Sequence, residues 1–382
     1  CNLLRCIARE VVGMDVGAPP PQPVPWEGLY HPDAPSHFVA VEDYLKWYKP
    51  HNAPTVGLLF SRHYWVNNNL QVEDMLIREI EAQGVNAIPA FSYAVKDEGL
   101  GAKGSGEVIR EYFLKDNVSR IDALIKLQAF FLSRNSRQDI TDTAVAHDGV
   151  ELLKKLGIPV FQPVISYYRT MKEWEHDPQG LGTDISWSIA MPEFEGMIEP
   201  IMIGAASREE DMGTTLRRRM PIEERCRKVV RRVVNWIKLQ KKPVAERRVA
   251  FILHNNPCAS VEATVGGGAH LDTLESVARI MQRMKEAGYK VNPPKDGKEL
   301  IDTIMERKAI SEFRWTTVDE IVSKGGALAF VSTEDYERWF NPLSPRVRDR
   351  MNGAWGEPPG KEMNGVPPNL NRKGQTNHET TT

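Results

Sequence analysis

The chain has few cysteines and no long apolar run. Its four cysteines, Cys1, Cys6, Cys226 and Cys258, form no Cys-x-x-Cys pair, so neither a zinc ribbon nor a disulfide framework is indicated. A cytoplasmic location is therefore expected. No apolar stretch approaches the roughly 20 residues that cross a membrane as a helix, so no membrane span is expected. The net charge of −2 argues against a chain-wide attraction to nucleic acid.

A phosphate-binding loop is also missing. Gly99–Gly106 is rich in glycine but lacks the Gly-Lys-Ser/Thr ending of a P-loop. The later glycines Gly266, Gly267 and Gly268 lack the Gly-x-Gly-x-x-Gly spacing of a dinucleotide site. Hydrolysis of ATP is therefore not expected in this chain.

What the chain does contain predicts several domains. With 382 residues, of which 41% are hydrophobic, it can bury two or three cores. Prolines between residues 18 and 25 predict a stiff linker, so residues 1–27 are interpreted as the stub of a preceding region plus this linker. The polar end, residues 361–382, is interpreted as a disordered or aberrant tail. The missing initiator Met and this tail favour a piece of a longer protein.

Strand and helix patterns alternate in a first domain, residues 28–212. The predicted strands cover 55–60, 85–91, 121–127 and 158–164, and the predicted helices cover 70–83 and 145–156. Such alternation predicts an α/β fold with a parallel, doubly wound sheet covered by helices on both faces.

A long basic helix over 214–241 is predicted within a connector, residues 213–245, and a second α/β domain over 246–360. That domain is expected to begin with a buried strand at Arg247–His254. Asp272 has capping-box spacing to Glu275, and Gly288 suits the end of the same helix. Further helices are expected near 297–308, 317–324 and 333–340.

Three carboxylates, Glu193, Glu195 and Glu199, interrupt the otherwise apolar segment Ile189–Pro200. Charged groups are costly to desolvate unless they are paired, bind a cation or take up a proton. The segment is therefore either the wall of a cavity that uses these acids or an exposed acidic loop between two elements.

A second candidate site is the loop that follows the strand predicted at 247–254. Ligands of open parallel sheets bind at the carboxyl ends of strands, where His254 is expected. Gly266, Gly267 and Gly268 precede a helix N-terminus at Asp272, which favours an anionic group. The alternatives are a flexible loop with an ordinary helix cap, and a histidine with a structural role.

Two further sets of residues have open roles. The arginine-rich stretch over 216–228 can attract the carboxylates of an acidic substrate, or it is a solvated helix face or a subunit contact. Four aromatic residues can stack on a planar ligand or pack in a core. They are Tyr167, Tyr168, Trp174 and Trp187.

Short motifs in a fixed order resemble one family, the large subunit of ATP-dependent cobaltochelatase (CobN) and its relative, the magnesium chelatase H subunit. The resemblance covers about residues 28–360, and Gly268–Thr273 is similar to the loop of the cobalt branch. The motifs are Leu156–Pro163, Glu173-Trp174, Gln179–Leu181, Ala190–Gly196, Ile198–Pro200, Leu271–Ser276, Glu337–Phe340 and Trp355–Gly360.

The resemblance implies a subunit that holds a tetrapyrrole or corrinoid while a metal is inserted, with ATP hydrolysed by separate AAA+ ATPase and adaptor subunits. The cobalt branch implies Co²⁺ insertion into a hydrogenobyrinic acid a,c-diamide type precursor in cobalamin biosynthesis. The alternatives are Mg²⁺ insertion into protoporphyrin IX and a non-catalytic module that binds a small ligand. Because the chain lacks much of the family's length, the piece alone is expected to be inactive.

The resemblance also implies roles for individual residues, because insertion removes two pyrrole N–H protons and needs a base. Glu193 matches the family's carboxylate and Glu195 its neighbouring acid. Glu193, Glu195 and His254 are the candidate catalytic residues; Glu193, Glu199 and His254 are the candidate metal ligands. Gly266, Gly267, Gly268 and Asp272 are the candidate cofactor-binding residues.

Overall fold

The computed structural model describes residues 2–18, 23–132, 144–211, 214–254, 265–268, 270–307, 318–327, 329–358 and 360. The chain divides into two compact units, residues 1–241 and 242–382. Each unit is described by itself.

A five-stranded sheet organises the first unit, in the order β1-β3-β2-β6-β7. Its strands are β1 (Gly28–Leu29), β2 (Thr55–Ser61), β3 (Asn86–Ser92), β6 (Ala123–Lys126) and β7 (Val160–Phe161). β3, β2, β6 and β7 are mutually parallel, and β1 joins the β3 edge antiparallel. This sheet confirms the predicted α/β class.

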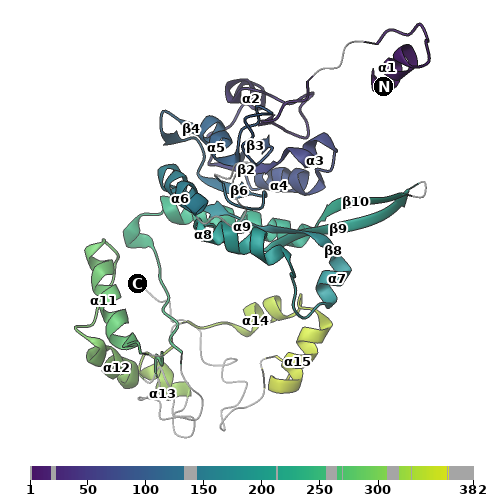
Figure 1. The fold of residues 1–382 in the computed structure, drawn as a ribbon. Coiled ribbons are helices and arrows are strands. Elements are labelled where there is room, and N and C mark those ends of the chain that lie inside the picture. Colours follow the sequence, from purple (N-terminus) through teal and green to yellow (C-terminus); the bar gives the residue numbers. More distant parts are fainter. Residues whose placement is uncertain are drawn as a thin grey trace. The chain divides into compact units, whose positions relative to one another are not determined.

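Helices cover both faces of the sheet, as Figure 1 shows. Alternate residues of β2 point to opposite faces, with Phe60 in one core and Leu59 in the other. Phe60 packs with α4 (Gln71–Ala82) and α9 (Glu223–Lys241). On the other side lie α2 (Val41–Tyr48), α5 (Ser105–Phe113) and α6 (Ala144–Leu156). The two cores are those of a doubly wound sheet.

A second sheet, in the order β10-β9-β8, continues from the first. It contains β8 (Val164–Thr170), β9 (Met202–Asp211) and β10 (Thr214–Pro221). The strand predicted over 158–164 is thus two strands in two sheets, separated by Pro163, whose nitrogen cannot donate a hydrogen bond. The remaining elements of the unit are α1 (Asn2–Glu10), α3 (Arg62–Val66), β4 (Leu114–Lys115), β5 (Val118–Ser119), α7 (Met171–His176), η1 (Ser186–Ala190) and α8 (Met191–Phe194).

The predicted helix over 214–241 was wrong in its first turns. Residues Thr214–Pro221 form β10, paired with β9 from Thr214↔Asp211 to Pro221↔Gly204, and the helix begins at Glu223. Pro221 disfavours helical backbone in the residue before it, and the hairpin satisfies these amides instead. The rest, α9, supplies Val229, Val233 and other residues to the first unit's core.

The second unit is helical in the residues that the structure describes. Its elements are η2 (Val244–Glu246), α11 (Thr273–Glu286), α12 (Gly297–Glu306), α13 (Val318–Ser323), α14 (Thr333–Phe340) and α15 (Pro345–Trp355). The strand predicted at Arg247–His254 is not formed. The apolar run pairs with no strand among the described residues, and Ile252 is 96% exposed. Asp272 caps α11 by accepting from Glu275 N, and Gly288 has a φ of 90°, so the predicted helix ends are confirmed.

Candidate active site at the carboxyl edge of the sheet

The sheet topology indicates where a ligand is expected. In the sheet, β2 lies between β3 and β6. The chain passes from β2 to β3 on one side and then crosses to β6 on the other side, which makes a topological switch point beside β2. Ligands of open α/β sheets bind at such a switch point, outside the carboxyl ends of the strands. The residues of interest therefore follow Ser61, Ser92, Lys126 and Phe161.

The crevice at this switch point is filled by the side chain of Gln128, which is 2% exposed. Its Nε2 donates to Phe60 O and to Ser92 Oγ, both at 2.9 Å, and its Oε1 accepts from Ser105 Oγ at 2.5 Å. These bonds join the ends of β2, β3 and β6. The candidate residues of the acidic segment lie farther along the edge, beside β6 and β7.

Lys126 ends β6 and its side chain is completely buried. Its Nζ donates to Gln128 O at 2.5 Å, Phe130 O at 2.9 Å and Gln162 Oε1 at 3.2 Å. Burial lowers the pKa of Lys126, because the charged form is desolvated, while the charge of Glu195 opposes that change. The ammonium group therefore holds the loop after β6 against the end of β7.

The acidic segment is helical and lies on the same edge. The π-helical turn η1 runs directly into α8, which ends at Phe194 and is followed by Gly196 with a φ of 92°. Gly196 N donates to Glu193 O and Met197 N to Pro192 O, the two bonds of a Schellman motif. Ile198 then pairs with Phe161 at the end of β7. The segment is thus a short helix anchored on the sheet.

Glu195 points into the protein and is 2% exposed. Its two carboxylate oxygens accept from Leu132 N at 2.9 and 3.1 Å. Burial raises the pKa of Glu195, and the charge of Lys126 and the Leu132 amide oppose that rise. Packing is tight, since a Cβ at Gly149 of α6 would lie 2.5 Å from Glu195 Cδ.

Glu193 points the other way and is exposed. Residues two apart on a helix lie about 200° apart around its axis, which separates Glu193 from Glu195. Its side chain has no hydrogen bond or ion pair with the parts of the chain that are described. Glu193 is therefore the carboxylate of the segment that is accessible to a ligand.

Glu199 is bound to α9. Its oxygens accept from Arg232 Nη2 at 2.5 Å and Nε at 2.7 Å, and its backbone is left-handed with a φ of 62°. The hydrogen bond from Arg232 holds the pKa of Glu199 below its ordinary value. This geometry gives Glu199 a structural role as the chain leaves the segment.

The remaining candidates lie in the second unit. His254 is exposed, and its carbonyl accepts from Gly266 N at 2.7 Å. Gly266–Gly268 are described, and a Cβ at Gly266 would lie 3.0 Å from Thr273 Cγ2. The Asp272 carboxylate accepts from Glu275 N at 3.1 Å, so it occupies a donor that an anion would use. Among the described residues, no three His, Cys, Asp or Glu side chains are grouped to hold a metal.

The arginine-rich stretch and the aromatic residues have diverse environments. Arg219 is buried and its Nη2 donates to both oxygens of Glu73 at 2.7 Å, so it is a core residue. Tyr167 stacks on Tyr64 in the same core. Trp174 lies under the Arg225 guanidinium. Tyr168 and Trp187, in contrast, contact each other at the surface.

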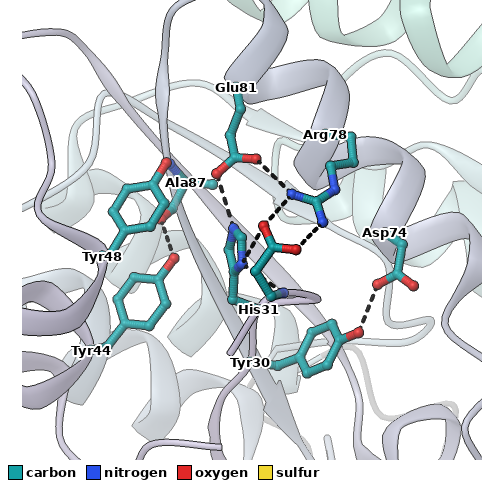
Figure 2. A network of polar contacts seen from close by, with 9 residues as sticks. Tyr30, His31, Tyr44, Tyr48, Asp74, Arg78, Glu81 and Ala87 are labelled. Carbon is teal, nitrogen blue, oxygen red and sulfur yellow. Dashed lines mark hydrogen bonds and ion pairs between the residues drawn. The ribbon is translucent and has the colours of Figure 1, made fainter. Parts of the chain in front are cut away.

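One polar cluster was not anticipated from the sequence. Buried His31 lies 2.9 Å from Glu81 through Nε2 and accepts from Asp33 N at 3.2 Å, and Arg78 binds the Asp33 carboxylate (Figure 2). Tyr30 N bonds to Pro89 O in the middle of β3, away from the carboxyl edge. The cluster therefore fastens the end of β1 to α4. Of its contacts, the Arg78–Glu81 spacing was visible in the sequence.

A cavity of about 420 Å³ opens between α5 and α6, beside Leu132. Basic and acidic side chains line it in equal number, and Lys96 is paired with Glu107 at 3.0 Å. This balance favours neither an anion nor a cation. No described helix is both long and apolar enough to cross a membrane.

The chain is similar to several known proteins. Residues 1–375 match the family described as CobN/Magnesium Chelatase. An uncharacterised protein of Methanocaldococcus jannaschii is 48% identical over 342 residues, which cover 89% of this chain and 27% of that protein. The magnesium-chelatase H subunit of Rhodobacter capsulatus is 29% identical over 364 residues, which cover 91% of this chain and 28% of that protein.

The fold also matches a solved structure, the catalytic subunit of cobaltochelatase from Mycobacterium tuberculosis. The TM-score is 0.66 at 22% sequence identity, and the match covers 95% of this chain and 27% of that one. The chain thus spans little more than a quarter of the length of each of these proteins.

Proposed function

Because the chain belongs to the CobN/Magnesium Chelatase family, we propose that it forms part of the large, tetrapyrrole-binding subunit of an ATP-dependent metal chelatase. The proposed reaction inserts Co²⁺ into a corrin precursor of the hydrogenobyrinic acid a,c-diamide type. Since the chain spans little more than a quarter of its relatives, the reaction is proposed for the whole subunit, and a wall of its substrate site for this chain.

The exposure of Glu193, on the same short segment as the buried Glu195, supports this proposal most directly. A short helix that ends in a Schellman motif presents Glu193 at the carboxyl edge, and buried hydrogen bonds fix the loop beneath it. An exposed carboxylate on a rigid support is suited to accept a proton from a bound substrate or to pass a metal ion to it.

The proposed chemistry balances without a redox step. A divalent metal ion replaces two pyrrole N–H protons, so each turnover forms the metal complex and releases two protons. Glu193 accepts one proton on a carboxylate oxygen and transfers it to water, and water takes the second directly. Glu195 positions α8 rather than reacting, because both of its oxygens are bound to Leu132 N. His254, an exposed residue of the second unit, is proposed separately as a metal ligand.

The partners follow from the same proposal. ATP is hydrolysed by AAA+ ATPase and adaptor subunits in the cytoplasm, and this chain supplies the tetrapyrrole surface. A second candidate is Mg²⁺ insertion into protoporphyrin IX, because the family description includes magnesium chelatase and the Rhodobacter relative is part of a magnesium chelatase.

The test is Glu193→Gln in the full-length subunit, assayed with its ATPase partners. Glu175→Gln on α7 is the matched control, because Glu175 is also an exposed acid of the first unit. We expect insertion to slow by about 100-fold or more in Glu193→Gln, the usual contribution of a general base, and to be unchanged in Glu175→Gln. Co²⁺ with the corrin precursor and Mg²⁺ with protoporphyrin IX are compared side by side. Equal rates for both variants and the wild type would remove Glu193 from the mechanism.

A further inference from the structure

Three aromatic rings lie in contact next to the acidic segment. Trp187 is the central ring, with centroids 6.4 Å from Phe130 and 6.4 Å from Tyr168. Tyr168 is 58% exposed, and the other two rings are half-buried. Because its neighbour Tyr167 packs in the core, the alternation of β8 turns Tyr168 outward. Partly exposed aromatic rings in mutual contact are a candidate surface for a flat, apolar ligand.

The backbone holds Phe130 in an unfavourable conformation. Its φ is 66°, in the left-handed region that bulky side chains rarely adopt. Two hydrogen bonds maintain it: Lys126 Nζ donates to Phe130 O, and Phe130 N donates to Trp187 O, each at 2.9 Å. The next residue, Phe131, is buried against Met191 at the start of α8. Strain that is maintained in this way is concentrated at functional sites.

The rings and Glu193 share one support. Trp187 lies in the π-helical turn η1, which continues into α8 without a break, and such turns are frequent at functional sites. Six residues separate Trp187 from Glu193, roughly 9 Å along a helix axis. The central ring and the accessible carboxylate are therefore carried by one continuous helical segment.

We infer that Phe130, Trp187 and Tyr168 form a stacking face for the flat ring of the tetrapyrrole substrate, an inference that rests on the proposed function. A conjugated macrocycle offers an apolar π surface to these rings, and each stacked ring strengthens binding. Lys126 is a positioning residue in this arrangement, because the hydrogen bond from its Nζ to Phe130 O holds the backbone of Phe130 in place.

The test measures binding of metal-free protoporphyrin IX, and of open-chain biliverdin as a less planar probe, to the full-length subunit. Trp187→Leu removes the central ring, and Phe130→Asn removes a ring while suiting the left-handed backbone. Trp339→Leu is the control, because Trp339 is an exposed tryptophan of the second unit. We expect the protoporphyrin Kd to rise about tenfold in Trp187→Leu and Phe130→Asn, with no change in the control and a smaller effect for biliverdin.

The stability of Phe130→Asn separates stacking from a packing role. We expect an unchanged or raised unfolding midpoint together with weaker protoporphyrin binding, because the substitution relieves the backbone while it removes the ring. If the wild type binds protoporphyrin and both variants bind it with the same Kd, the stacking face would be overturned and the proposed function would stand. Unaltered probe binding combined with loss of the ATPase subunits would reassign the face to a protein contact. A wild type that binds no tetrapyrrole would contradict the proposed function itself.

Discussion

Gly149→Ala on α6 gives the sharpest test of how the acidic segment is held. In an ordinary helix this change is stabilising by up to about 1 kcal/mol. Here the added Cβ would overlap the Glu195 carboxylate, lying 2.5 Å from Cδ and 3.0 Å from Cγ. The Glu195 carboxylate must then move away from Leu132 N, so the substitution is expected to destabilise the protein instead of stabilising it.

The magnitude follows from what is lost. Hydrogen bonds to a charged, buried acceptor contribute about 1.5–3 kcal/mol and overpacking costs about 1–3 kcal/mol. After subtraction of the helix gain of about 1 kcal/mol, the expected net destabilisation is about 1.5–5 kcal/mol. Urea unfolding measures this free energy, and amide hydrogen exchange at Leu132 reports the lost bond directly. Gly353→Ala on α15 is the control, because nothing lies within 4 Å of its added Cβ.

A double-mutant cycle isolates the contact. In a Glu195→Ala background the carboxylate is gone, so Gly149→Ala is expected to be neutral or stabilising, a coupling of about 2 kcal/mol or more. Stabilisation by Gly149→Ala alone, or the same cost in both backgrounds, would refute the placement of Glu195 against α6.

Three further predictions concern the charged groups around this edge, and a fourth concerns the β1 cluster. Lys126→Met leaves the Phe130 carbonyl without its donor and Glu195 without a nearby cation, so we expect a loss of about 3 kcal/mol in urea unfolding; a neutral result would show that the ammonium group is dispensable. Burial raises the pKa of Glu195 in the folded state, so its contribution to stability is lost as the pH rises above the ordinary value of 4.5. Glu195→Gln should remove this pH-dependent decrease in the free energy of unfolding, which urea unfolding at several pH values between about 4.5 and 7 measures. A pH profile identical to that of the wild type would contradict the raised pKa. Arg232 lowers the pKa of Glu199, so their pair contributes stability above pH 4.5 that is lost in acid. Arg232→Ala should lower the free energy of unfolding by at most about 1 kcal/mol at neutral pH, because Arg232 is half-exposed. In acid the substitution should have no effect. A cost that persists in acid would mean that Arg232 acts through packing. His31→Ala should lower the free energy of unfolding by about 2–3 kcal/mol, because it removes the bond to Glu81 and the ring contact with Trp47, and should leave tetrapyrrole binding unchanged; weaker binding would bring the β1 cluster into the site.

The strands of the first sheet could be predicted because they are buried on both faces. Thr55–Ser61 and Asn86–Ser92 appear as short apolar runs followed or preceded by helical periodicity, which local patterns express fully. The helix over 71–82 was predicted within one residue at each end. These elements form because their own apolar side chains become buried, and the pattern of apolar residues is visible in the sequence of each segment.

The predictions from sequence were wrong for segments whose structure depends on whether a partner strand pairs with them. Thr214–Pro221 is charged and has no strand-like alternation, and it becomes β10 because β9 lies beside it. Arg247–His254 has the composition of a buried strand, yet it pairs with no strand among the described residues. Whether a segment pairs depends on a partner strand outside it, which the segment's own pattern does not report.

The candidate site was predictable in position but not in the roles of its acids. Proline and glycine around Glu193 marked a structured segment. The burial of Glu195 depends on Leu132 and Gly149, which are distant in sequence. The lysine that ends the apolar run 121–127 was a visible signal, since a charge there needs partners. Its three acceptors, in contrast, come from two separate loops.

We propose that the carboxyl edge, with Glu193 and the loop after β6, lines a tetrapyrrole site. Hydrogen–deuterium exchange of the full-length subunit, with and without a metal-free tetrapyrrole, tests it most directly. We expect slower exchange on binding in residues 128–132 and 186–196, with no change around the β1 cluster at residues 30–33. Binding that leaves 128–132 and 186–196 unprotected would contradict it.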